Sequence, residues 1–462
     1  MIKKIIGFAP GVIVPMALNF MLTFLYARYL EPGEYGVFNI YLNTIQIVYA
    51  LTLSLFQTAA LRYYSIQNTY RNEREFVSTY FWGNIFITLA IVPVAITISF
   101  LLSFNWWIVT LSVGINGLYQ FFCTLYRLKS SSLHYNIMRC ISSIISLIIL
   151  IWCANRIVPL TYFWPIAATY GSYAILVIYE VVANRKLINI QCFSFSLLKE
   201  SVHYGLPLIG VTLLGNIIAN SDQYFLMYYL GDEAVGNYAL GYRLVDALII
   251  NMLTMILLVM TPELNKRHDT NGMSQSSVVL SKMIDSAFWI ILPISFAVIV
   301  YADYIIKYIF PSYMAAAHIM RLVVFASIFH GISMFTCKGL ELVRKSKYIL
   351  LSLLVAAAAN CIYNFVFIPI YGIDASAHSS LLAYILYNVL LMFYTKKYYK
   401  MNIDAKYIWR CSLAVISTII VAIILMRVCP ITNLLVLLGE IMICCVIYFS
   451  LSFALRLLRV FI

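Results

Sequence analysis

The chain has 462 residues, of which 63% are hydrophobic and only 11% are charged, with a net charge of +13 and a mean hydropathy of +0.90. A water-facing surface needs roughly a quarter of its residues charged, so this composition excludes a soluble protein. Apolar runs of about 20 residues recur along the chain, which is the length of a helix across a bilayer, whereas a β-barrel shows alternating segments of about ten. We therefore expect an all-α polytopic membrane protein.

The N-terminus resembles a secretory signal, because Lys3 and Lys4 precede an apolar stretch. That stretch is too long for a signal core, contains Pro10 and Pro15, and leads into further membrane segments. We expect it to be a first transmembrane helix that stays attached.

Fourteen segments are long and apolar enough to cross a membrane as helices of about 18 to 25 residues. They are residues 5–27, 36–60, 76–100, 107–125, 137–153, 162–182, 204–230, 237–260, 284–301, 315–337, 348–368, 373–394, 408–426 and 434–455. An even number of spans puts both termini on the same side of the membrane.

Lysine and arginine are distributed unevenly between the two sides. With the N-terminus inside, only six of the 31 basic residues lie in outer or intramembrane positions, and the other 25 lie in inner connections and tails. The six are Arg28, Arg156, Arg243, Lys307, Arg321 and Arg427. Since cytoplasmic connections carry the positive excess, we expect both termini in the cytoplasm. The basic residues are spread over many inner segments, which favours contact with anionic lipid and indicates no nucleic-acid partner.

The sequence carries no signature of a nucleotide, metal or cofactor site. It has no G-x-x-x-x-G-K-[ST] phosphate loop and no D-x-D pair, and its ten cysteines lie mostly in apolar runs without metal-ligand spacing. The longest interruptions between spans, residues 185–203 and 262–283, are too short for a soluble domain. We expect no catalytic residue, no metal and no cofactor, and transport driven by a proton or sodium gradient or by a partner.

A weak internal repeat appears when the chain is shifted by two hundred residues. The matches are Tyr29, Leu30 and Gly36 with Tyr229, Leu230 and Gly236, and Phe38 opposite Tyr238. Both windows follow helices that run outward, so they predict two parallel six-helix lobes around a central cavity. We place the N-terminal lobe at residues 1–200, the C-terminal lobe at 201–400, and two additional transmembrane helices at 401–462.

The first and seventh predicted helices both contain glycine and proline near their inner ends. These residues are Gly7, Pro10, Gly11 and Pro15 in one and Gly205, Pro207, Gly210 and Gly215 in the other. Interrupted helices at corresponding positions of two halves are typical of a transport site. The alternative is that glycine and proline are simply common in membrane helices.

Several short motifs resemble one family in the same order along the chain. They are LEPGEYG at 30–36, HYGLPL at 203–208, SDQ at 221–223, LGDEAVGNY at 230–238, IFPSY at 309–313 with AAA at 315–317, Asn360 and Asn364, and PIYGI at 369–373. Over most of residues 1–395 the chain is similar to polysaccharide-type lipid flippases, the Wzx or O-antigen group of the multidrug/oligosaccharidyl-lipid/polysaccharide (MOP) exporter superfamily. The two helices beyond residue 400 exceed the twelve often drawn for O-antigen members.

The resemblance implies the substrate and the location of the protein. The implied substrate is an undecaprenyl-pyrophosphate-linked oligosaccharide repeat unit of O-antigen, lipopolysaccharide or another surface polysaccharide. The protein would flip it across the bacterial inner (plasma) membrane by alternating access, with polysaccharide polymerase machinery as a further partner.

Charged side chains inside a membrane are costly and so indicate function. Arg243 and Asp246 lie three residues apart on one helix face, where they can form a structural ion pair, or Arg243 can present its guanidinium to a pyrophosphate. Arg28 and Arg62 mark opposite ends of the first helix pair, where they contact the headgroup or act as snorkelling anchors.

Asp222 is the leading candidate for coupling to an ion gradient. It lies in a predicted span without a basic neighbour in sequence, where desolvation favours its protonated form and an opening cavity favours ionisation. The alternative is a tertiary salt bridge. Asp246 is a further coupling candidate.

A second polar stripe follows the inner half of the tenth predicted helix. It consists of His330, Met334, Lys338 and Glu341, with His330 as a secondary coupling candidate and Lys338 as a pyrophosphate candidate. Glu440 is also intramembrane, and the sequence assigns it no role.

Three functions compete for this sequence. A secondary transporter that flips lipid-linked glycan fits best, and the protein is then not an enzyme. A membrane polymerase or ligase of the same lipid-linked sugars would need a long outer loop, and the longest here, residues 302–314, holds two charges, Asp303 and Lys307. A MATE-like exporter of small cationic drugs would favour an acidic cavity, whereas an arginine suits an anionic headgroup.

Overall fold

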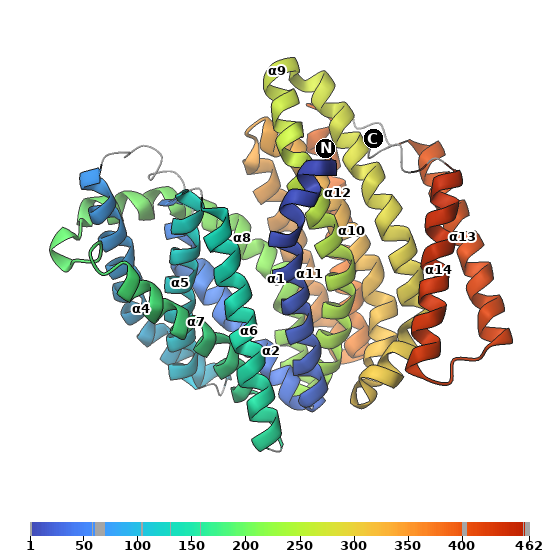
Figure 1. Ribbon diagram of the computed structural model, residues 1–462, viewed down its shortest axis with the longest axis horizontal. Helices are drawn as coiled ribbons and strands as arrows, with labels where there is room; N and C mark the ends of the chain where they lie inside the picture. Colours follow the sequence, from blue (N-terminus) through green and yellow to red (C-terminus); the bar gives the residue numbers. More distant parts are fainter. Residues whose placement is uncertain are drawn as a thin grey trace. The chain divides into compact units, whose positions relative to one another are not determined.

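The computed structural model describes residues 2–57, 59–60, 70–102, 105–129, 131–157, 159–399, 404–455 and 457 (Figure 1). This part of the chain is mostly helical and contains no strand. The helices are α1 (Ile2–Tyr29), α2 (Pro32–Thr52), α4 (Tyr70–Leu102), α5 (Trp106–Leu128), α6 (Ser132–Arg156), α7 (Phe163–Ala183), η1 (Ile190–Cys192), α8 (Phe195–Leu230), α9 (Asp232–Ile309), η2 (Pro311–Tyr313), α10 (Ala316–Leu342), α11 (Ser346–Tyr371), α12 (Ile373–Thr395), α13 (Ala405–Val428) and α14 (Leu434–Ala454).

The number of membrane-crossing segments agrees with the sequence. Eleven helical segments among the described residues have the length and hydropathy of a span, two of them within α9. Helices α1, α2 and α8, with 28, 21 and 36 residues, are also long enough, since about 20 residues at 1.5 Å each cross the hydrocarbon core. The expected all-α polytopic architecture of about fourteen spans is confirmed.

Helix α9 contains the one sharp change of direction reported inside the described helices. Gly272 has φ 71° and ψ −160°, a conformation that costs glycine little because it has no Cβ. Helix continues on both sides of it, so the interruption between spans predicted at residues 262–283 consists of the adjoining ends of two long helices that meet at this glycine.

Helices α1 and α8 are continuous, which corrects the expectation of interrupted helices. Each is helical at every residue from its first to its last, although both contain proline. Gly205 has a packing role instead, because a Cβ there would lie 2.6 Å from the Cβ of Leu55 and 3.0 Å from its backbone. The glycine lets α8 approach the chain that follows α2.

By its internal contacts the chain divides into two units, residues 1–216 and 217–462, and the division falls within α8. In the first unit α4 packs on α5, α5 on α7, α6 on α7, and α1 on α6. In the second, α9 packs on α10, α10 on α12, and α11 on α12. The pairing order is thus similar in both units, while the lobe boundaries at 200 and 400 stay predictions.

The last two helices form a hairpin that packs on α9 within the second unit (Figure 1). The contact is an apolar cluster that includes Phe296 and Tyr301 of α9, Cys411 and Ala414 of α13, and Cys444 of α14. Helices α13 and α14 are therefore part of the second unit's helical core.

Candidate functional site

Asp222 lies on α8 and is fully buried in the second unit. Its carboxylate accepts a short hydrogen bond from the hydroxyl of Tyr238 on α9 and a 3.2 Å hydrogen bond from Ser380 Oγ on α12. The backbone N–H of Gln223 donates to it at 2.9 Å. These donors come from three helices, so the tertiary fold, and not the sequence around residue 222, builds this site.

No ion pair formed among the described residues involves Asp222. The tertiary salt bridge that was the alternative to a coupling role is therefore not formed in the part of the chain that the structure describes. A buried carboxylate stabilised only by neutral donors can change its charge without breaking a salt bridge. This arrangement suits a group that exchanges a proton or a cation.

Neutral oxygen atoms from α11 and α12 extend the site. Ser221 Oγ donates to Asn360 Oδ1 at 2.8 Å, and Asn364 Nδ2 donates to the same oxygen at 3.2 Å. Two buried oxygens, Asn364 Oδ1 and Ser376 Oγ, make no hydrogen bond in the structure. We refer to Asp222, Tyr238, Asn360, Asn364, Ser376 and Ser380 as the Asp222 cluster.

Every member of the Asp222 cluster has a relative exposure of 0%. Burying this many polar groups costs free energy unless they are paired, so their clustering on four apolar helices indicates function. Sequence reasoning missed Tyr238 and the serines as site residues. The available signal was their spacing, since Asn360 and Asn364, and Ser376 and Ser380, are each one helical turn apart within an apolar span.

Arg243 and Asp246 lie on α9, and both side chains are half-buried. Asp246 accepts a 2.8 Å hydrogen bond from Ser327 Oγ on α10, and no ion pair within 4.0 Å joins it to Arg243. The structural ion pair that was the alternative reading is absent among the described residues. The Arg243 guanidinium thus makes no direct contact with the carboxylate one turn away.

His330 on α10 packs against α12. Its ring stacks on Tyr384 with the ring centres 4.5 Å apart and the planes inclined by 15°. Its Nδ1 atom is buried and neither donates nor accepts a hydrogen bond in the structure. The imidazole is positioned by packing and retains one ring nitrogen for a further partner.

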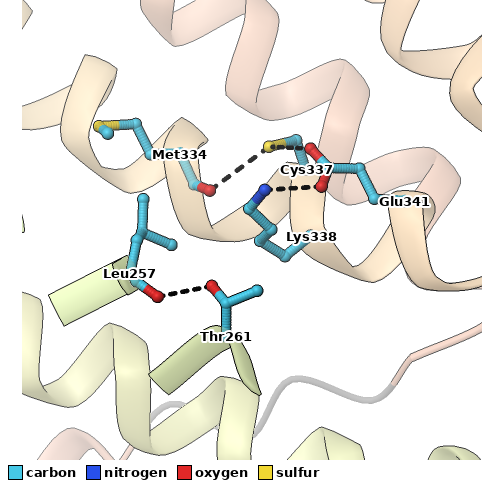
Figure 2. Close-up of polar contacts among 6 residues, drawn as sticks. All are labelled: Leu257, Thr261, Met334, Cys337, Lys338 and Glu341. Carbon is cyan, nitrogen blue, oxygen red and sulfur yellow. Dashed lines mark hydrogen bonds and ion pairs between the residues drawn. The ribbon is translucent and has the colours of Figure 1, made fainter. Parts of the chain in front are cut away.

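Lys338 is engaged within its own helix, as Figure 2 shows. Its Nζ lies 2.6 Å from Glu341 Oε2, while Cys337 Sγ lies 3.6 Å from the other carboxylate oxygen. Leu257 and Thr261 of α9 lie below this group in the view, and Thr261 Oγ1 donates a hydrogen bond to the backbone carbonyl of Leu257. An anion at Lys338 would have to compete with Glu341 for the ammonium group.

The two remaining arginine candidates belong to the N-terminal part of the chain. Arg28 is exposed in the last turn of α1, where a cation stabilises the negative end of the helix. Arg62 lies outside the described residues.

A family model described as polysaccharide biosynthesis protein matches residues 25–318. No curated protein matches the chain significantly. Among solved structures, a lipid II flippase MurJ in an inward closed conformation superposes with a TM-score of 0.78 at 16% identity, covering 98% of this chain and 99% of the other.

Two further solved structures share the fold. An inward-facing multidrug resistance MATE transporter of the MOP superfamily gives a TM-score of 0.65 at 12% identity, covering 83% of this chain and 94% of the other. A MATE transporter of Vibrio cholerae gives 0.58 at 16% identity, covering 84% and 93%. At these identities the likeness concerns the fold.

Proposed function

The chain belongs to the family of polysaccharide biosynthesis proteins, and from this premise we propose that it is a secondary transporter that flips a lipid-linked oligosaccharide from the cytoplasmic to the outer leaflet. It works by alternating access and is not an enzyme. The fold it shares with a lipid II flippase and with MATE transporters supports a transport function.

The substrate we propose is an undecaprenyl-pyrophosphate-linked repeat unit of O-antigen or another surface polysaccharide. Arg243 supports an anionic headgroup, because it is half-buried and forms no ion pair among the described residues. A guanidinium can bind a pyrophosphate through two parallel hydrogen bonds, which an ammonium cannot. A cavity lined by such a group disfavours the cationic drugs that an acidic site would bind.

The observation that carries the transport proposal is the Asp222 cluster. A buried carboxylate held by neutral donors can bind a proton or a sodium ion, and the same cluster contains two buried oxygens without hydrogen bonds. When the site opens to water the carboxyl group releases its proton, or the carboxylate its sodium ion, which couples the gradient to flipping. Transport of this kind requires no bound nucleotide.

The protein would lie in the bacterial inner membrane with both termini in the cytoplasm. The distribution of 25 basic residues in inner segments against six elsewhere supports this orientation. Polysaccharide polymerase machinery on the outer side is the partner class that consumes the flipped product.

Depleting the protein in its own host tests the function. Lipid-linked repeat units should remain intact but accumulate on the cytoplasmic leaflet, where an added membrane-impermeant glycosidase or lectin cannot reach them in whole spheroplasts. Surface polysaccharide should be lost. Repeat units that reach the outer leaflet and fail to polymerise would instead identify a polymerase or ligase, and intact surface polysaccharide with lost drug resistance would identify a small-molecule exporter.

A further inference from the structure

The α13–α14 hairpin is fastened to α9 near both ends of the contact. At one end Tyr448 Oη donates to the backbone carbonyl of Trp289 at 2.7 Å, and Trp289 Nε1 donates to Ser452 Oγ at 3.0 Å. At the other end Tyr308 Oη donates to the carbonyl of Ile431 at 2.9 Å. Between these bonds the interface consists mainly of apolar side chains and includes one carboxyl group.

That carboxyl group belongs to Glu440 of α14. The side chain is 4% exposed and lies on the buried stripe of α14 together with Leu437 and Cys444. Both carboxyl oxygens have less than 1 Å² of accessible area and make no hydrogen bond in the structure. The nearby Tyr301 hydroxyl contacts Cys444 Sγ at 3.5 Å instead.

No cation of the surrounding helices neutralises Glu440 among the residues that the structure describes. The titratable groups on the hairpin-facing side of α9 are Asp285, Tyr301, Tyr304 and Tyr308, and those on the inner faces of the hairpin are Tyr407, Cys411, Cys444 and Tyr448. The basic residues of these segments, Lys307, Lys406, Arg410 and Arg427, are exposed. An ionised Glu440 would therefore be a charge without a partner.

The composition of the interface also decides which ligand fits this carboxyl group. Alkali and alkaline-earth cations need several oxygen ligands, whereas the buried side chains of this interface are mostly apolar and neither oxygen of Glu440 has a hydrogen-bonding partner. A proton needs a single carboxylate oxygen. The Asp222 cluster differs in this respect, because it gathers hydroxyl, amide and carboxylate oxygens from several helices.

We propose that Glu440 is a proton-binding site inside the membrane and that its proton keeps the α13–α14 hairpin docked on α9. With the proton bound, the neutral side chain is tolerated in the apolar interface. When the proton is lost, the unpaired charge must reach water or lipid headgroups, which requires the hairpin to separate from α9. The site is separate from the Asp222 cluster and independent of the transported substrate.

Infrared spectroscopy of the purified full-length protein in lipid vesicles tests the protonation state. The difference spectrum between wild type and Glu440→Gln at pH 7 should contain the carbonyl band of a protonated carboxylic acid, and alkaline titration should remove it. A spectrum that contains only carboxylate bands at pH 7 would overturn the proposal. Glu440→Leu serves as a second neutral replacement, and the exposed Glu233→Gln is the matched control that should show carboxylate bands.

The docking step is tested with two neighbouring native cysteines. Cys444 is buried in the interface and Cys445 is exposed, so a small membrane-permeable thiol reagent should modify Cys445 first. In wild type the ratio of Cys444 to Cys445 modification, read by mass spectrometry, should rise several-fold as the pH is raised, beyond the rise in Glu440→Gln. Equal ratios in the two proteins at every pH would refute proton-controlled docking. Neither experiment requires flipping activity. A negative result would therefore leave the transport proposal intact, and failure of the transport proposal would leave the Glu440 proposal intact.

Discussion

The hydroxyl of Tyr238 on α9 donates a hydrogen bond to the carboxylate of Asp222 on α8, and both residues are fully buried. Sixteen residues separate them in the sequence, across the turn at Gly231, which has φ 84°. The pair joins the two helices that begin the second unit. It also makes Tyr238 the residue that orients the proposed coupling carboxylate.

We expect Asp222→Asn to bind substrate but to lose gradient-driven flipping, because the amide cannot exchange a proton and binds cations weakly. Asp222→Glu should keep a measurable part. Transport per folded molecule, measured in reconstituted vesicles with an imposed pH or sodium gradient, checks this, and omission of sodium at fixed pH separates the two ions. An Asn variant that responds to both gradients like the parent would end the coupling hypothesis.

Tyr238→Phe should destabilise the protein by about 1–3 kcal/mol, because it leaves the buried carboxylate with one donor fewer. Tyr242→Phe is the matched control, since the Tyr242 hydroxyl is buried without a hydrogen bond and its removal should be neutral or stabilising. Thermal unfolding of both variants, alongside transport per folded molecule, provides the comparison. Equal losses of stability would show that the Tyr238 hydroxyl does not support Asp222.

Arg243→Ala should abolish surface glycan at normal protein level, and Arg243→Lys should recover part of it, because the charge survives while the bidentate geometry is lost. Arg321→Ala serves as the control. Arg321 is paired with Asp303 and lies near the end of its helix, so its loss should cost less than about 1 kcal/mol and leave surface glycan intact. Full activity of the Ala variant at position 243 would exclude a pyrophosphate role for Arg243.

The orientation in the membrane predicts which side each connection occupies. Reporters fused after four connections should report cytoplasm, and two others should report the outer side. The inner positions are Asn68, Asn189, Asn271 and Asn402, of which the first and last lie outside the described residues, and the outer positions are Asn105 and Asp374. An outer signal from two or more inner positions would contradict the two-lobe topology.

The sequence by itself determined the class of protein and the number of spans. Both depend on local composition, because a bilayer of fixed thickness requires about 20 apolar residues in each helix. The same local reasoning failed at α8, where Gly205 and Pro207 predicted an interrupted helix that is continuous. Glycine at a close contact is compatible with an intact helical backbone, and only the packing against Leu55 reveals that use of Gly205.

The sequence also selected Asp222 and Arg243 as unusual, since a charge inside an apolar span is costly wherever it lies. What each residue contacts was decided by the tertiary structure. Arg243 and Asp246 are three residues apart and could have paired, yet Asp246 bonds to Ser327 on α10. Asp222 could have met a cation, yet it meets Tyr238 and Ser380.

Glu440 shows most clearly the difference between what the sequence selects and what the tertiary structure decides. Its position in the sequence places a carboxyl group within a membrane helix, and the sequence assigned it no role. Only the packing of α14 on α9 shows that both of its oxygens are buried without partners. The physical reason is that hydropathy depends on neighbours along the chain, whereas the partners of a buried charge come from helices far away in sequence, whose side chains meet only after the spans have packed.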